Sequence, residues 1–117
     1  MKRCLVGACT LLVSAASLAH HSVSSLYDYT NVQRIEGTLT SIRWVNPHVQ
    51  LKIETINAEG ELEVWQLEAS ALNLLRRLGV DKEAIKVGDK VAATGPVSRR
   101  GQKTMIASTL TLPDGRT

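Results

Sequence analysis

The sequence predicts a mostly β chain folded as one small barrel, and three observations support this fold class. Segments rich in β-branched residues alternate apolar and polar side chains, as half-buried strands do. Clusters of turn-forming residues separate these segments. The first segment shifts the phase of its apolar residues once, as a strand does when a bulge lets it coil around a barrel.

The first predicted strand covers residues 33–44. Its apolar positions begin as Ile35 and Leu39 and then change phase to Ile42 and Trp44. Because glycine in a strand leaves room for a bend, Gly37 supports the same coiled path. A break follows at the Asn-Pro pair, where proline lacks a backbone donor and restricts the residue before it.

Two further strands follow this break. Residues 48–56 alternate strictly, with Val49, Leu51 and Ile53 on one face. Residues 57–60, with the sequence Asn-Ala-Glu-Gly, form a hairpin turn, and residues 61–68 return as the third strand. The third strand is apolar on both faces, which predicts that the helix or the N-terminal arm covers its second face.

A short helix is predicted over residues 70–78, with Ser70 as its N-cap and Gly79 at its end. Residues 81–85 add one more turn, and residues 90–96 and 103–112 form the last two strands around a hairpin turn at 99–102. Three strands, a helix and two strands is the order of a five-stranded OB-type barrel. An open α+β sheet with the same elements is the alternative.

The N-terminus resembles a secretory signal. Two basic residues precede an apolar stretch that ends in Ser-Leu-Ala, so we expect residues 1–19 to be cleaved after Ala19. A lipoprotein signal ending before Cys9 is the rival interpretation. Residues 20–32 are then an extended arm, and residues 33–117 are the single barrel domain. The apolar stretch is too short to span a membrane. The mature protein is therefore predicted to be periplasmic.

Cleavage of the signal changes the composition of the mature protein, and the predicted function depends on that composition. Of the 117 residues, 98 remain, and both cysteines leave with the signal, which excludes disulfides and cysteine chemistry. The formal net charge falls from +3 to +1, because two basic residues also leave. Basic residues are not clustered, so nucleic acid is not a predicted partner. Small ligands and envelope proteins remain as the predicted partners.

Histidines indicate a candidate copper site. After cleavage, the α-amine and imidazole of His20 lie on one residue, and His21 follows it. Nitrogen donors of this kind suit Cu(II). His48, the third histidine in the chain, is the predicted additional ligand, and Asp28 is a weaker oxygen candidate. The alternative interpretations are a solvated histidine pair and a structural role for His48.

Aromatic and amide side chains indicate a second kind of site. Trp44 and Asn46 precede His48 in the string Trp-Val-Asn-Pro-His, which at a barrel rim would contact a small ligand. A packed turn is the alternative interpretation. OB-type barrels bind ligands around strands two and three. That face is predicted to include Gln50, Lys52, Glu54, Glu63 and Trp65.

Catalysis has little support in the sequence. There is no nucleophile elbow, no phosphate-binding glycine loop and no His-Glu-x-x-His helix. Glu61, Glu63 and Glu68 are close together in sequence, but strand carboxylates mostly serve solvation. The sequence therefore predicts a non-enzymatic binding protein that binds Cu(II). The alternative is a barrel that binds an envelope oligosaccharide, peptide or protein partner.

Several short motifs together resemble a family of small exported proteobacterial proteins of unknown function. The match covers nearly the whole mature chain, and Trp-Val-Asn-Pro-His is its most specific element. This resemblance implies a periplasmic location and a compact, mostly β fold, and it carries no established activity, ligand or catalytic residue. The motifs are His20-His21-Ser22, Tyr27-Asp28, Glu36-Gly37-Thr38, Trp44-Val45-Asn46-Pro47-His48, Val87-Gly88-Asp89 and Leu112-Pro113-Asp114-Gly115.

Overall fold

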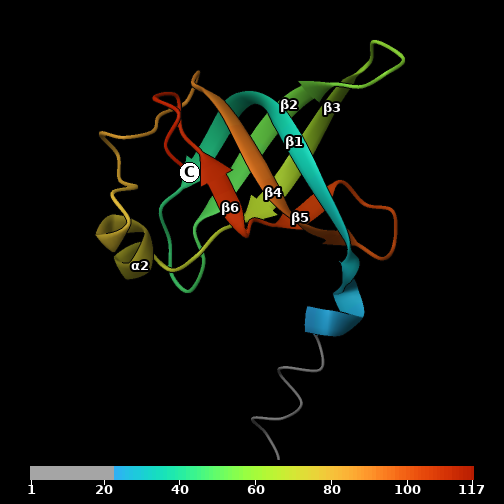
Figure 1. Cartoon of the computed structure of the whole chain (residues 1–117), viewed down its shortest axis with the longest axis horizontal. Helices are drawn as coiled ribbons and strands as arrows, with labels where there is room; N and C mark the ends of the chain where they lie inside the picture. The colour runs from blue at the N-terminus through green and yellow to red at the C-terminus, as the bar shows by residue number, and fades with distance from the viewer. Residues whose placement is uncertain (1–22) are drawn as a thin grey trace, which may run out of the picture.

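The computed structural model describes residues 23–117, which contain six strands and one labelled helix (Figure 1). One further helical turn covers residues 23–26. The predicted signal sequence, His20 and His21 lie outside the described residues. The labelled elements are β1 (Tyr27–Arg43), β2 (Gln50–Ile56), β3 (Leu62–Glu68), α2 (Leu72–Arg77), β4 (Lys90–Ser98), β5 (Thr104–Ile106) and β6 (Thr109–Thr111).

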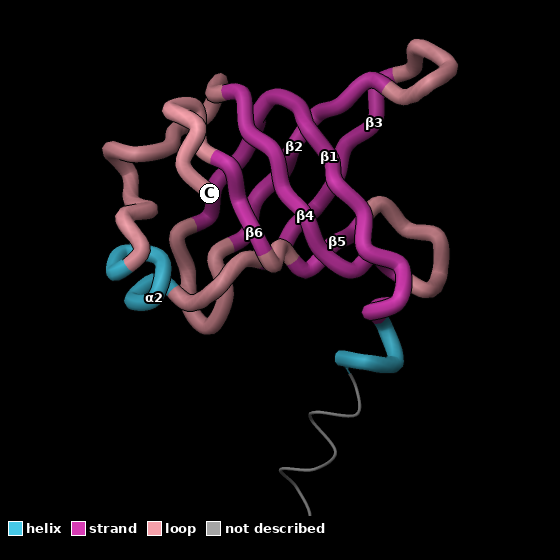
Figure 2. The backbone as a smooth tube through the Cα atoms, in the orientation of Figure 1, coloured by secondary structure: helices cyan, strands magenta, loops and turns pink. Residues whose placement is uncertain are grey.

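The strands close into a barrel, as the crossing tubes of Figure 2 show. β1 pairs with β2, β2 with β3, β3 with β5, β5 with β4, and β4 returns to β1. All these pairings are antiparallel except that of β3 with β5. β6 pairs with residues 92–94 of β4, on the edge of β4 that also pairs with β5 at Val97. The predicted five-stranded OB-type barrel is confirmed, and the open-sheet alternative is wrong.

The long first strand begins earlier than the sequence indicated. β1 starts at Tyr27 rather than residue 33, and its first half pairs with β4. The extended arm predicted over residues 20–32 is therefore wrong from residue 23 onwards, because residues 23–26 form a helical turn and residues 27–32 belong to β1. The register shifts between Leu39 and Ser41, which confirms the predicted bulge. The sequence did not predict this part of the strand, because the residues at the start of β1 are mostly exposed and show no alternation of apolar and polar side chains.

Arg99 fixes the start of β1 from the loop after β4. Its backbone N–H donates to the Leu26 carbonyl at 2.9 Å, and its side-chain Nε donates to the Ser24 carbonyl at 3.2 Å. Its Nη2 lies 3.5 Å from Asp28 Oδ1. These contacts attach residues 24–28 to the barrel.

Two glycines allow strands to approach one another closely. A Cβ added at Gly37 would lie 2.0 Å from the Glu54 carbonyl oxygen, and one at Gly95 would lie 1.8 Å from that of Ile106. Neither position therefore accommodates a side chain. Gly37 confirms the close bend predicted in β1, whereas the need for Gly95 was not predicted.

The barrel interior is apolar. β2 contributes Leu51 and Ile53 to it, directly after the buried Val49, which confirms the alternation read from the sequence. Other strands and the loop before β4 complete the core, and the described residues include no buried polar or charged residue. The largest fully buried side chains are Leu39, Val49, Ile53, Leu67, Ile85 and Met105.

The helix is shorter than predicted. α2 begins after Ala71, whose side chain cannot cap it, so the predicted N-cap Ser70 is wrong. Leu75 is buried in the core and Leu78 is 64% exposed, so the apolar side of the helix is only partly covered. Gly79 follows the helix with a positive φ, as predicted.

The last predicted strand, residues 103–112, divides into β5 and β6. Its inward side chain in the barrel is Met105, which is fully buried, whereas Ile106 is only partly buried. Between the two short strands, the Ala107 N–H donates to the Glu68 carbonyl and the Ser108 N–H to the Thr94 carbonyl, both at 2.8 Å. The chain therefore crosses from β3 to β4 at this point.

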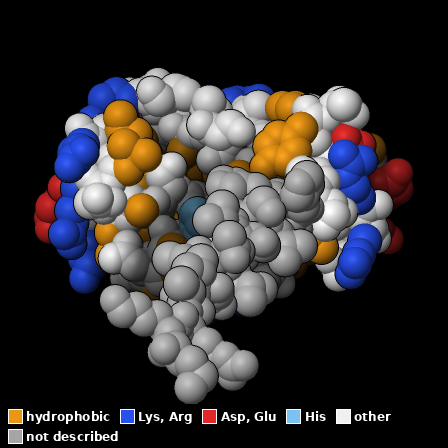
Figure 3. All heavy atoms as spheres, turned by 90° about the horizontal axis from the view of Figure 1, so that it is seen from below, with side chains coloured by type: hydrophobic (Ala, Val, Ile, Leu, Met, Phe, Trp, Pro, Cys, Tyr) orange, Lys and Arg blue, Asp and Glu red, His pale blue; other side chains and the backbone are white. Residues whose placement is uncertain are grey.

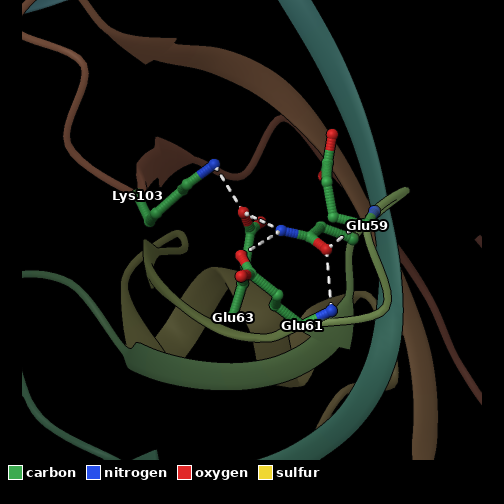
Figure 4. A network of polar contacts seen from close by, with 5 residues as sticks. Glu59, Glu61, Glu63 and Lys103 are labelled. Carbon is green, nitrogen blue, oxygen red and sulfur yellow. Dashed lines mark hydrogen bonds and ion pairs between the residues drawn. The ribbon is translucent and has the colours of Figure 1, made fainter.

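The hairpin between β2 and β3 is held by a polar network (Figure 4). The Asn57 side-chain oxygen accepts the backbone N–H groups of Glu59 and Glu61, and its amide nitrogen donates to the carboxylates of Glu61 and Glu63. Lys103 Nζ lies 3.0 Å from Glu63 Oε1. The hydrogen bond from Lys103 is the main reason that the pKa of Glu63 is lowered, and Asn57 adds to it.

In residues 23–117 no helix is long and apolar enough to cross a membrane.

We expect Gly95→Ala to destabilise the protein by about 3 kcal/mol, because the added methyl overpacks against a backbone carbonyl that cannot move independently. Urea denaturation, followed by tryptophan fluorescence, measures this change. Gly101→Ala is the control, since nothing lies within 4 Å of its added Cβ and only its positive φ costs about 1 kcal/mol. Equal losses in the two variants would contradict the close approach.

We expect Glu63→Gln to change how stability depends on pH. A carboxyl whose pKa is lowered by folding stabilises the protein above its unfolded pKa, and this contribution disappears as pH falls through the folded pKa. The wild type should therefore exceed the variant in stability at neutral pH, and the difference should disappear below about pH 4.

Thermal denaturation across this pH range provides the measurement. Glu59→Gln is the control, because the carboxylate of Glu59 has no ion-pair partner in the described part of the chain. A wild-type advantage that persists unchanged at pH 3 would contradict the role of the Glu63 charge.

Candidate functional site

The loop between β1 and β2 connects the barrel to the segment before α2. Trp44 is partly buried and packs against the core. Asn46 Oδ1 accepts the backbone N–H of Leu72 at 3.4 Å, in the first turn of α2. The Ala69 N–H donates to the Val49 carbonyl at 2.8 Å, and the Val49 N–H donates to the Ser70 carbonyl at 3.2 Å. Trp44 and Asn46 therefore have structural contacts, as the packed-turn interpretation of this motif requires.

The imidazole of His48 is oriented by a single hydrogen bond. Its Nδ1 lies 3.1 Å from the carbonyl oxygen of Ala69, and a carbonyl only accepts hydrogen bonds. Nδ1 must therefore carry a proton, and in the neutral ring the lone pair of Nε2 is free on an exposed residue. An imidazole held in this way through one nitrogen is the usual arrangement of a metal-ligating histidine.

The other predicted metal ligands do not join His48 in the described chain. His20 and His21 lie outside residues 23–117, and within that range no three His, Cys, Asp or Glu residues form a metal-binding group. Asp28 already accepts the hydroxyl of Thr30 at 2.7 Å and its N–H at 3.0 Å. These hydrogen bonds, followed by the charge of Arg99, lower the pKa of Asp28.

Trp65 is part of the core. Its exposed fraction is 6%, and Lys103 Nζ lies 5.3 Å from the centre of its ring. Its prediction as a residue of an exposed ligand-binding face is wrong, because along β3 the positions of Trp65 and Leu67 point inwards. Glu63 shares this orientation and is engaged in the hairpin network, so it too is absent from the outer face.

The outer face of β1, β2, β3 and β5 carries a polar hollow of about 320 Å³. Strand register sets its side chains in two rows. One row runs across the sheet through Arg43, Gln50 and Glu68. The second runs through Ser41, Lys52, Gln66 and Thr104. Tyr27 completes the lining, together with parts of Leu51 and Leu67.

Sequence reasoning identified only Gln50 and Lys52 of these rows. Glu54, also predicted for this face, lies one row further along β2, opposite Val64, and does not line the hollow. Thr104 was missed because β5 pairs with β3 in parallel, and no local turn indicates that pairing. For the β1 residues that line the hollow, the one signal in the sequence was the phase change of the apolar residues. The bulge that causes this change turns Ser41 outwards.

The charges in the hollow are available to a ligand. Arg43 Nη1 donates to Gln50 Oε1 at 2.9 Å, so the guanidinium is positioned by a neutral partner. Arg43, Lys52 and Glu68 form no ion pair with any residue between 23 and 117. The arrangement therefore offers hydroxyl, amide, cationic and carboxylate groups together. Catalysis by Glu61, Glu63 and Glu68 is not supported by their positions, because Glu68 lies at the other end of β3.

Comparison with solved structures shows the same fold in another protein. The mitochondrial single-stranded DNA binding protein of S. cerevisiae superposes with a TM-score of 0.54 at 11% identity, over 77% of this chain and 99% of that one. A small single-stranded DNA-binding protein from Streptomyces coelicolor gives a TM-score of 0.44 at 15% identity, over 68% and 88% of the two chains.

No curated protein matches the sequence. A family model does, and it covers residues 9–107, which include the hollow, the Trp-Val-Asn-Pro-His loop and every strand except β6. The resemblance to an uncharacterised family is thereby confirmed: the chain belongs to DUF6152, a family of unknown function.

Proposed function

We propose that this protein is a non-enzymatic binding protein of the periplasm whose ligand is a short oligosaccharide of the cell envelope. The observation that supports it best is the pair of polar rows across the hollow. Neighbouring strands lie about 4.8 Å apart, so four strands span about 14 Å, roughly the length of two or three sugar rings. Each ring would contact its own amide, hydroxyl or charged group.

The chemistry of the rows favours a hydroxylated ligand over a nucleic acid. Sugars present many donors and acceptors, and Gln50, Gln66 and Glu68 offer planar groups that pair with them. Proteins that bind single strands stack bases on exposed aromatic side chains. The chain has no Phe, Trp65 is buried, and Tyr27 is the one aromatic residue that lines the hollow.

We expect chitotriose to perturb the amide resonances of β2, β3 and β5 in a nuclear magnetic resonance titration. Lys52→Ala should weaken binding about tenfold, because a hydrogen bond from a charged group contributes about 1.5–3 kcal/mol. Lys82→Ala, in the turn after α2, is the control with an equal charge loss. Equal weakening in both variants would contradict the proposed face. So would a preference for an oligothymidine over chitotriose.

The orientation of His48 supports a second candidate function, Cu(II) binding at the mature N-terminus. Cleavage after Ala19 would give His20 a free α-amine, and His20 with His21 would then bind Cu(II) together with Nε2 of His48. The residues described place only His48, so this candidate depends on the arm reaching the loop between β1 and β2. Arg99 holds residues 24–28 against the barrel, and Tyr27 within this segment lines the same hollow as Gln50.

A Cu(II) titration of exported protein, with its N-terminus verified by intact mass, tests this candidate. We expect one tight equivalent that is lost when an extra alanine precedes His20, because the amine then leaves the chelate. His48→Ala should weaken the same equivalent. If His48→Ala binds Cu(II) as tightly as the wild type, the site is a chelate of the N-terminal residues alone. If the chain with the extra alanine binds as tightly as the wild type, Cu(II) binding is not the function.

A further inference from the structure

A second hollow lies between α2 and the C-terminal segment and shares no residue with the polar hollow. It is a groove of about 590 Å³, within the range of small-molecule sites. Figure 3 shows hydrophobic side chains reaching the surface on the side where α2 lies. The apolar walls are formed by Leu75, Leu78, Val80, Ala107, Leu110 and Leu112.

The groove presents apolar surface to water. Leu75 and Leu112 are buried at its base, whereas Leu78 remains 64% exposed. Covering such a side chain with hydrocarbon is favourable, at about 25 cal/mol for each Å² removed from water. Most lining residues are apolar, and the polar ones besides Arg116 carry only hydroxyl groups: Ser70, Ser108, Thr109 and Thr117. A hydrocarbon chain fits these walls better than a sugar does.

A cation lies at the edge of the groove. Arg116 donates through Nε to Asp114 Oδ2 at 2.7 Å, and its carbonyl accepts the Leu112 N–H at 2.8 Å. Its Nη1 lies 3.1 Å from the point where a Cβ on Gly79 would stand, just after α2. The C-terminal turn therefore holds the guanidinium beside the helix. Within residues 23–117, neither terminal nitrogen of Arg116 has a hydrogen-bond partner.

We propose that this groove binds a single-chain anionic amphiphile of the fatty acid class, with its hydrocarbon against the leucines and its carboxylate on the terminal nitrogens of Arg116. Guanidinium groups bind carboxylates through two parallel hydrogen bonds, and both terminal nitrogens are available. The site is independent of the oligosaccharide face, so either can fail without the other.

Isothermal titration of the purified protein with laurate, octanoate and dodecanol tests the proposal, below the micellar concentration of each carboxylate and below the solubility limit of the alcohol. Laurate should bind at one to one, and octanoate should bind at least tenfold more weakly, because each methylene buried contributes to affinity. Arg116→Gln should weaken laurate about tenfold and leave dodecanol unchanged. Arg77→Gln, on α2 but outside the groove, should change neither.

Leu78→Ser should weaken both laurate and dodecanol, whereas Leu74→Ser should weaken neither. Both leucines are exposed, so neither variant disturbs the core, but only Leu78 lines the groove. The proposal is overturned if laurate does not bind, if Arg116→Gln binds laurate as tightly as the wild type, or if the two leucine variants behave alike.

Discussion

The double pairing of β1 is the constraint on which the rest of the structure depends. Its first half pairs with β4 and its second half with β2, so one strand serves both sides of the barrel. The change of partner falls at Thr38, which is registered with both Lys90 and Glu54. Gly37 permits the close approach beside it, and the bulge after Leu39 turns the strand. Without this turn there is no closed barrel.

Both hollows follow from this closure. Once β1 has turned, Ser41 and Arg43 point outwards beside β2 and begin the two polar rows. At the other side of the barrel, the chain between β5 and β6 leaves β3 for β4 and lies opposite α2, which leaves the apolar groove between them. One hollow is lined mostly by polar side chains and the other mostly by apolar ones. The fold therefore presents two hollows of different chemistry.

Local patterns predicted the parts of the fold that local physics determines. The alternation in β2, the hairpin turn at 57–60 and the end of the helix at Gly79 all depend on near neighbours in sequence, and each was predicted. The start of β1 was not predicted, because its side chains are exposed and show no pattern. It is a strand because it forms backbone hydrogen bonds with β4, which is distant in sequence. The polar rows were mostly missed for a related reason. A row across four strands can be predicted only when the register of all four is known. No local sequence pattern indicates that β5 pairs in parallel with β3.

The pairing of β1 with β4 also sets an order of folding. Ile35 and Ala93 are registered partners although they lie 58 positions apart, and the barrel closes only when residues 104–106 reach β3. Loop-closure entropy must be overcome before such distant contacts stabilise anything, so folds of this kind form slowly. A nascent chain shorter than about residue 106 cannot complete the barrel. The finished barrel therefore arises only after residues 104–106 have emerged, so a chain exported as proposed would stay unfolded until late in its passage.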